Sequence, residues 1–113
     1  MTSPITTHVL DTALGRPAAG VAVNLEIEVF DGQWKELGRG TTDDGGRISQ
    51  LLADDFAAGT YRLTFDTKSY FLARNVPCFY PRVTIVFTVR DAKEHYHIPL
   101  LLSPYGYSTY RGS

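Results

Sequence analysis

Three histidines, His8, His95 and His97, carry the side chains of this sequence best suited to acid–base chemistry near neutral pH. A neutral imidazole can take a proton from water, and a protonated imidazole can donate one to a leaving group. His95 and His97 are two residues apart, so on a strand they share a face and could also chelate a metal, with His8 as a third ligand. A structural alternative is that they are solvated or hydrogen-bonded histidines on a polar sheet face. The residues alone leave these interpretations open.

Arg47 directly follows TDDGG, a turn-forming stretch at residues 42–46. Its planar cation could bind an anionic substrate or stabilise a developing oxyanion. The ordinary alternative for an arginine beside a turn is a solvated surface group, and nothing in the local sequence distinguishes Arg47 from Arg39 or Arg62.

Sequence motifs typical of serine hydrolases and of nucleotide-binding proteins are missing. There is no G-x-S-x-G elbow, phosphate-binding loop or dinucleotide fingerprint. Cys78 is the only cysteine, which excludes an intrachain disulfide and a cysteine metal cluster and favours a reducing compartment. The sequence finishes on YGYSTYRGS, where three tyrosines stand at a place that usually frays. By default these tyrosines are packing or interface residues.

The strands that must position these residues are indicated by a two-residue period of apolar and polar side chains. Apolar and polar residues alternate in VAVNLEIEVF (21–30), TYRLTFD (60–66) and RVTIVFTVR (82–90). In EHYHIPLLL (94–102) the alternation places the two histidines on the face opposite the apolar residues. Such alternation is typical of antiparallel sheets with one buried face. Pro99 in the last of these stretches indicates an edge or an irregularity, where a site or a subunit contact can form.

Turn residues divide the chain into seven or eight short strands, which predicts an all-β, two-sheet antiparallel sandwich. The expected strands cover about 5–11, 20–30, 33–40, 46–49, 60–66, 82–90, 94–102 and 105–111. DTKSYFLARN (66–75) lacks alternation and predicts one or two helical turns capped by Asp66 or Thr67. Pro77 and Pro81 keep the following stretch irregular.

Length and charge narrow the class of protein. The chain has 113 residues, which predicts one domain over residues 1–113. Its formal net charge of −1 gives no electrostatic reason to expect nucleic acid or a membrane surface as a partner. The first residues lack the features of a secretory signal, no run is long enough to span a membrane, and the final RGS is not a peroxisomal signal. We therefore expect a cytoplasmic protein.

Five stretches carry a family resemblance that covers essentially the whole chain. They are, in order, HVLDTALGRPAAGVAV, GGR, GTYRLTFDTKSYF, FYPRVTIVF and HYHIPLLLSPYGYSTYRGS. Together they resemble the transthyretin-related 5-hydroxyisourate hydrolases. The final YRGS is the most specific of these features, because in that family it separates the hydrolases from the hormone-carrying transthyretins.

The resemblance implies an eight-stranded transthyretin-like sandwich with one short helix before the sixth strand. It also implies a homotetramer, a dimer of dimers, with active sites in a channel between the dimers. The implied substrate is a small purine-derived molecule, 5-hydroxyisourate, whose six-membered ring is opened by hydrolysis to 2-oxo-4-hydroxy-4-carboxy-5-ureidoimidazoline. No cofactor or metal is implied.

Residues that match the family's functional motifs are assigned roles by the resemblance alone. The expected catalytic residues are His8, Arg47, His97 and Ser113, and the expected substrate-binding residues are His8, Arg47, Tyr110, Arg111 and Gly112. In this hypothesis the two histidines activate water, the arginine stabilises the oxyanion and the tyrosine hydrogen-bonds the heterocycle.

Ser113 offers both a hydroxyl and the terminal carboxylate, which could orient a histidine or pair with Arg47 or Arg111. A nucleophilic role for its hydroxyl is less favoured than attack by water. His95 receives no role from the resemblance and is expected to flank the site. The competing hypotheses are a non-catalytic carrier of a small ligand, a metal-dependent hydrolase and a structural module.

Overall fold

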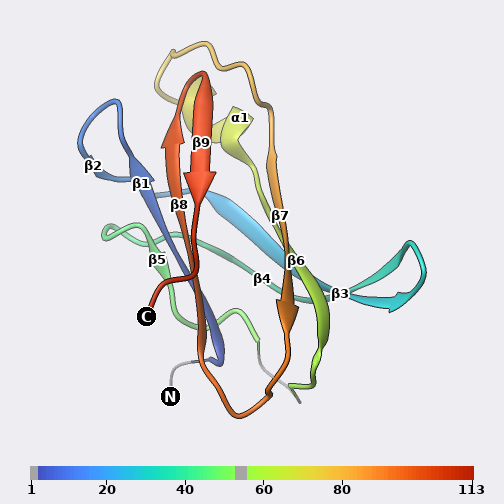
Figure 1. Cartoon of the computed structure of the whole chain (residues 1–113). Helices are drawn as coiled ribbons and strands as arrows, with labels where there is room; N and C mark the ends of the chain where they lie inside the picture. Colours follow the sequence, from blue (N-terminus) through green and yellow to red (C-terminus); the bar gives the residue numbers. More distant parts are fainter. Residues whose placement is uncertain (1–2, 53–55) are drawn as a thin grey trace.

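The computed structural model describes residues 3–52 and 56–113, and within them two β-sheets pack face to face with one short helix (Figure 1). The elements in these ranges are β1 Ile5–Asp11, β2 Arg16–Pro17, β3 Ala22–Phe30, β4 Gln33–Thr41, β5 Arg47–Ile48, β6 Gly59–Phe65, α1 Thr67–Leu72, β7 Val83–Val89, β8 Tyr96–Ser103 and β9 Gly106–Thr109. One sheet has the order β2-β1-β8-β9, with β5 also paired to β1, and the other has the order β4-β3-β6-β7. The expected domain over 1–113 includes residues 1–2 and 53–55, which lie outside the described part.

The predicted two-sheet sandwich with one short helix is confirmed. The eight expected strands correspond to β1 and to β3 through β9. β2 is an addition, because Arg16–Pro17 lies in a stretch expected only as a connection, yet Pro17 is paired with Leu10 of β1. Two residues are too few to show alternation, and the turn-forming residues around Arg16–Pro17 favour a connection over a strand.

The described sheets are mainly antiparallel, as predicted, with one exception. β1 and β8 run parallel, in a register that extends from Ile5 opposite Tyr96 to Asp11 opposite Leu102. Alternation identifies the side chains that share a face but does not specify the direction of the neighbouring strand. Parallel neighbours need a long connection, and here the chain between them builds the whole second sheet.

The core lies between the sheets and follows the predicted alternation. Leu25, Leu63 and Phe65 have no exposed surface, and neither does Val9 on the facing sheet. The alternation of buried and exposed side chains is lost toward the end of β3, where Val29 is 47% exposed. Its pairing with β4 shifts register at two places beyond Leu25, so the end of this hairpin leaves the core.

Helix α1 begins where the sequence predicts. Asp66 is the N-cap, and its Oδ1 accepts a hydrogen bond of 3.1 Å from the amide of Ser69. Tyr70 and Phe71 are buried, and the Tyr70 hydroxyl donates a 2.7 Å hydrogen bond to Oδ2 of Asp11 in β1. The helix is therefore attached to the sheet that carries the histidines.

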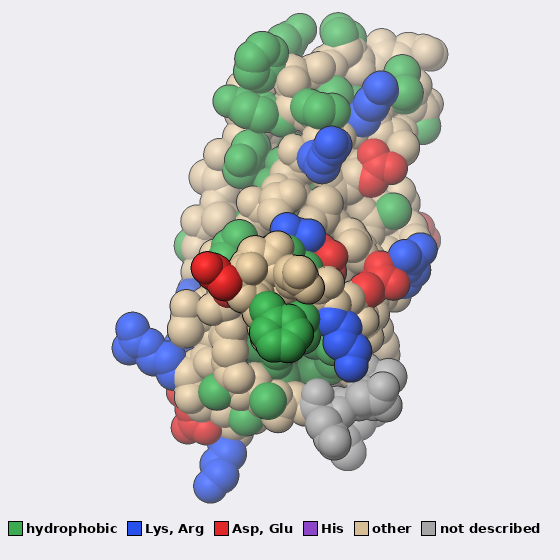
Figure 2. All heavy atoms as spheres, turned by 90° about the vertical axis from the view of Figure 1, so that its right-hand side faces the viewer, with side chains coloured by type: hydrophobic (Ala, Val, Ile, Leu, Met, Phe, Trp, Pro, Cys, Tyr) green, Lys and Arg blue, Asp and Glu red, His purple; other side chains and the backbone are tan. Residues whose placement is uncertain are grey.

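Aromatic side chains gather on the surface at one end of the sandwich. Tyr80 makes edge-on contacts with Phe79 and Tyr107, at centroid distances of 4.9 and 5.2 Å. Figure 2 shows hydrophobic side chains at this upper end, and no histidine of the described residues is visible on that side of the molecule. Within the described ranges, no helix has the length and apolar character needed to cross a membrane.

Candidate active site

The outer face of the β2-β1-β8-β9 sheet carries the candidate site. In β1, Ile5 and Val9 are buried in the core, so Thr6 and His8, which alternate with them, project to the outer face. His8 is half-buried there. The alternation that builds the core thus also places a histidine on the opposite surface.

Arg47 is brought to His8 by the short strand β5, which pairs these two residues directly. The preceding turn is held by Asp43, whose Oδ1 accepts hydrogen bonds of 2.9 Å from the amides of Gly45 and Arg47. Gly46 has φ 75°, and a Cβ there would lie 2.4 Å from the carbonyl oxygen of Val9. Glycine is therefore required for β5 to approach β1 closely enough to pair Arg47 with His8.

His97 reaches the same face from β8, where it is paired with Thr6. Its ring lies 6.5 Å from that of His8, centroid to centroid. Nδ1 of His97 is 2.8 Å from Oγ1 of Thr6, and Nε2 of His95 is 3.2 Å from the same oxygen. The Thr6 hydroxyl therefore lies between two imidazoles.

The end of the chain returns along β8 and reaches His97 (Figure 1). β9 pairs with β8 as far as Thr109 opposite Leu100. Pairing with β8 is then interrupted beside Pro99, which has no amide hydrogen to donate. It continues at Gly112, whose amide donates a 2.8 Å hydrogen bond to the His97 carbonyl. Pro99 thus marks an irregularity, as its presence in a strand predicts.

These residues surround a hollow of about 330 Å³. Its lining residues are Thr6, Thr7, Arg47, Ile48, Ser49, His95, His97 and Ser113. His8 stands beside the hollow, next to Arg47 and His97. Among the described residues, the Arg47 guanidinium makes no hydrogen bond or ion pair, so its donors are available to a bound molecule.

The electrostatics of this face favour neutral imidazoles. Burial lowers the pKa of His8 and the charge of Arg47 lowers it further, against a hydrogen bond to the Gly45 backbone and the charge of Asp43. Burial also lowers the pKa of His97, and the charges of His8, Arg47 and His95 lower it further, against a hydrogen bond to the Thr6 backbone. A neutral imidazole is the form that can act as a base.

Two of the expected substrate-binding residues lie outside this hollow. Tyr110 and Arg111 line a different hollow of about 310 Å³ beside β7. The Arg111 guanidinium is 3.3 Å from Glu94 and lies over the ring of Tyr96, 4.4 Å from its centroid. Within this chain, the expected residues that meet at the histidine hollow are His8, Arg47, His97, Gly112 and Ser113.

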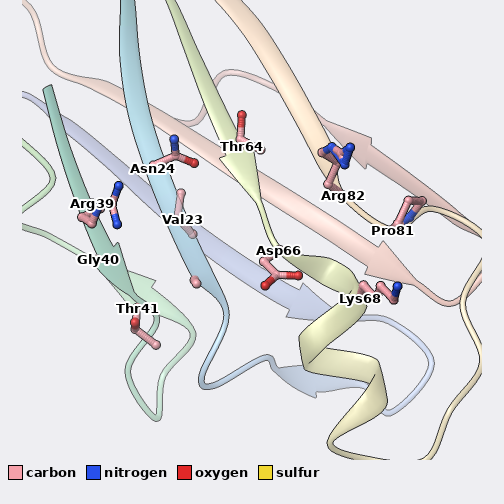
Figure 3. Close-up of a pocket in the computed structure, with 11 residues that line it drawn as sticks. Val23, Asn24, Arg39, Gly40, Thr41, Thr64, Asp66, Lys68, Pro81 and Arg82 are labelled. Atoms are coloured by element: carbon pink, nitrogen blue, oxygen red, sulfur yellow. The ribbon is translucent and has the colours of Figure 1, made fainter. Parts of the chain in front are cut away.

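A larger hollow of about 830 Å³ lies on the outer face of the other sheet (Figure 3). Its residues come from β3, β4, β6, the start of α1 and the segment before β7, and they include the cations Arg39, Lys68 and Arg82. It contains no histidine and no candidate from the sequence. Its size therefore does not make it the candidate site.

Thr6 is the residue of the site that sequence reasoning missed. It is 7% exposed and contacts both histidines of the H-x-H pair. Its place beside His97 follows from the parallel pairing of β1 with β8, which no local sequence pattern predicts. Within residues 3–52 and 56–113, no three His, Cys, Asp or Glu side chains are grouped so that they could hold a metal ion.

The sequence matches the HIUase/Transthyretin family over residues 5–112. It is 49% identical to a probable 5-hydroxyisourate hydrolase of Caenorhabditis elegans, in a match covering 99% of this chain and 83% of that protein. It is 48% identical to the 5-hydroxyisourate hydrolase of Mus musculus, in a match covering 98% of this chain and 96% of that protein.

Two solved structures share the fold. The 5-hydroxyisourate hydrolase of Klebsiella pneumoniae superposes with a TM-score of 0.85 at 38% identity, covering 96% of this chain and 98% of that one. Sea bream transthyretin in complex with thyroxine superposes with a TM-score of 0.91 at 35% identity, covering 97% and 95%. The fold alone therefore does not distinguish an enzyme from a thyroxine-binding protein. Sequence over nearly the full length and fold agree that the chain belongs to the HIUase/Transthyretin family.

Proposed function

We propose that this protein hydrolyses 5-hydroxyisourate to 2-oxo-4-hydroxy-4-carboxy-5-ureidoimidazoline without a cofactor. The observation that carries the proposal is the meeting of His8, His97 and Arg47 on one sheet face, beside the hollow that Ser113 also lines. The relatives named 5-hydroxyisourate hydrolases, at 46–49% identity, support the choice of substrate.

The reaction begins with attack of water on the ring carbonyl beside the hydroxylated carbon. His97 or His8 takes a proton from the water as its oxygen bonds to the carbonyl carbon, whose own oxygen becomes negatively charged. Arg47 stabilises that oxyanion through guanidinium donors that no side chain in the described part of the protein engages. The lowered pKa values of the two histidines support this role, because they keep the imidazoles neutral before attack.

Ring opening follows when the carbon–nitrogen bond breaks. The imidazolium returns its proton to the departing ring nitrogen, so the proton removed from water ends on the ureido nitrogen of the product. The Ser113 end of the chain orients the imidazole or the substrate in the hollow that they share. A nucleophilic Ser113 is less favoured, since a serine at this position is exposed and weakly held.

Assembly as a homotetramer, a dimer of dimers, completes the proposed site. β7 and β9 are edge strands of the two sheets and line one hollow, so both present unpaired edges on the same side. Tyr110 and Arg111 belong to that side, and in the proposed tetramer Tyr110 hydrogen-bonds the heterocycle at the channel between the dimers.

A carrier of a small aromatic ligand is the alternative, because the thyroxine complex of sea bream transthyretin has the same fold. The two histidines and Arg47 count against it, since a passive carrier has no need of two neutral bases beside a cation. A metal-dependent hydrolase is the second alternative, and it predicts that a chelator abolishes activity.

The test is an absorbance time course of 5-hydroxyisourate, generated from urate by urate oxidase, against its spontaneous decay. We expect decay that accelerates in proportion to protein, is insensitive to a chelator, and is lost in Arg47→Ala. Arg39→Ala is the matched control, because Arg39 is an exposed arginine paired with Glu36 on the other sheet. Decay at the spontaneous rate with folded protein would refute the enzyme proposal, and thyroxine binding would then be measured.

A further inference from the structure

We propose that Thr6 and His95 are positioning residues that connect His97 to solvent through a hydrogen-bonded proton relay. This inference rests on the proposed hydrolase function. Its three groups are consecutive in space: Nδ1 of His97 is 2.8 Å from Oγ1 of Thr6, which is 3.2 Å from Nε2 of His95. The two rings are nearly parallel, with an interplanar angle of 13° and centroids 6.5 Å apart.

Along this chain of hydrogen bonds, a buried threonine joins a half-buried imidazole to an exposed one. Thr6 is 7% exposed, His97 is half-buried in the hollow, and His95 is exposed. The Thr6 hydroxyl has an imidazole nitrogen within hydrogen-bond distance on each side, so the two rings can satisfy both its donor and an acceptor position. The relay therefore runs from the site to the surface of the protein.

The Thr6 hydroxyl has one proton, and this couples the tautomers of the two rings. It can donate to only one imidazole and must accept from the other. When His97 carries its proton on Nδ1, that proton is donated to Thr6, and the Thr6 hydroxyl donates to Nε2 of His95. His97 then presents an unprotonated Nε2 for catalysis. The hydrogen bond from its ring to the Thr6 backbone favours the same arrangement.

The reaction gives this relay a proton to carry. Opening a cyclic amide yields a carboxylic acid, and a carboxyl group with a pKa of about 3.5 loses its proton near neutral pH. Nε2 of His97 takes that proton, the Nδ1 proton passes to Thr6, and the Thr6 proton passes to Nε2 of His95. His95 then releases its Nδ1 proton to solvent. The reverse transfer through water restores the starting tautomers once the product has left.

Other charged groups face this chain of hydrogen bonds. Arg47 from β5 and His8 from β1 lie on the His97 side, and Ser113 lines the same hollow. On the His95 side, Arg111 donates to the His95 carbonyl at 3.3 Å and pairs with Glu94. Arg47 disfavours a lasting positive charge on the His97 ring, so a proton taken up there is more stable once it has moved outward to the exposed imidazole of His95.

The coupling is tested by long-range ¹H–¹⁵N NMR of the histidine rings in the folded protein, which requires no activity. Thr6→Val replaces the hydroxyl by a methyl of similar size, and Thr6→Ser retains the hydroxyl. We expect the valine variant to change the tautomer ratio of both rings and the titration of His97, and the serine variant to restore them. Unchanged tautomers and titration of His97 in Thr6→Val would overturn the proposal.

The relay is tested by turnover with a diffusible base. We expect His95→Ala to lower kcat on the order of tenfold with little change in KM, and imidazole buffer to restore the rate. Lys93→Ala is the control, since Lys93 is exposed in the same loop and lies outside the relay. A His95→Ala enzyme with wild-type kcat, or one that imidazole does not rescue, would refute the relay. If the wild-type protein itself lacks activity, the proposed function fails, whereas the NMR comparison still decides whether Thr6 couples the rings.

Discussion

Gly112 packs its backbone directly on the imidazole of His97. A Cβ on Gly112 would lie 2.6 Å from Cδ2 of His97 and 3.3 Å from Cγ of Pro99. The Gly112 amide also donates to the His97 carbonyl at 2.8 Å. The glycine in YRGS is therefore explained by contact with a proposed catalytic ring, since any side chain there would have to displace it.

We predict that Gly112→Ala lowers kcat/KM of the proposed hydrolysis by about 100-fold, because displacing a catalytic ring by about 1 Å has an effect of that size. Stability should change little, since Gly112 is at the end of the chain and forms only an isolated bridge. The measurement is the 5-hydroxyisourate time course together with thermal unfolding.

Gly106→Ala is the matched control for this variant. Gly106 lies in the neighbouring strand β9, and a Cβ there would meet only Oγ of Ser103 at 3.7 Å. Full activity in both variants would show that the position of the His97 ring does not depend on Gly112.

The fold was predictable from the sequence because alternation and turn residues are local signals. The helix was predictable for the same reason, since Asp66 caps it in the way its side chain favours. The parallel direction of β1 and β8 was not, because it depends on how the whole second sheet returns the chain. The relative direction of two strands depends on the topology of the whole fold, and the sequence of neither strand specifies it.

The site was predictable only in part. Three residues distant in the sequence, His8, Arg47 and His97, were expected to act together through the family resemblance alone, and cross-strand pairing accounts for their proximity. Thr6 was missed because a threonine in a strand is unremarkable until its neighbours are known. Tyr110 lies in another hollow because the irregular segment beside Pro99 carries it to the β7 side.

Removing the charge of Arg47 should raise the pKa of both His8 and His97, because that charge lowers both. We predict that Arg47→Met moves the two NMR titration curves to higher pH and abolishes hydrolysis. Arg47→Lys should leave the titration curves near their wild-type positions, since it keeps the charge, while losing activity with the planar donors. Identical titration in Arg47→Met and wild type would contradict the electrostatic coupling of this face.

Activity and stability should both decline on the acid side. The pKa values of His8 and His97 lie below the ordinary 6.5, so kcat/KM should fall on the acid side, with a midpoint below pH 6.5, as the neutral bases are protonated. The unfolded chain binds these protons first, so the free energy of unfolding should also decrease as the pH falls below 6.5. A pH–rate profile and urea unfolding at several pH values measure the two effects. An acid limb centred above pH 6.5 would contradict the assignment.

The hydrogen bond from Tyr70 to Asp11 should contribute to stability independently of catalysis. Asp11 is 2% exposed, and its other oxygen accepts from the amides of Ala13 and Leu14 at 3.0 Å, so loss of the Tyr70 donor leaves a buried carboxylate oxygen unpaired. We predict that Tyr70→Phe lowers the free energy of unfolding by about 2 kcal/mol, with unchanged kcat in the folded protein. Tyr105→Phe, at a side chain 67% exposed, should change it by less than about 0.5 kcal/mol.

Burial, and then the bond to Asp11, raise the pKa of Tyr70 to about 12 from 10.0, so the contribution of Tyr70 to stability should persist below pH 10 and be lost as the pH rises toward 12. Equal stability of Tyr70→Phe and wild type in urea unfolding would show that this bond does not hold α1 to β1.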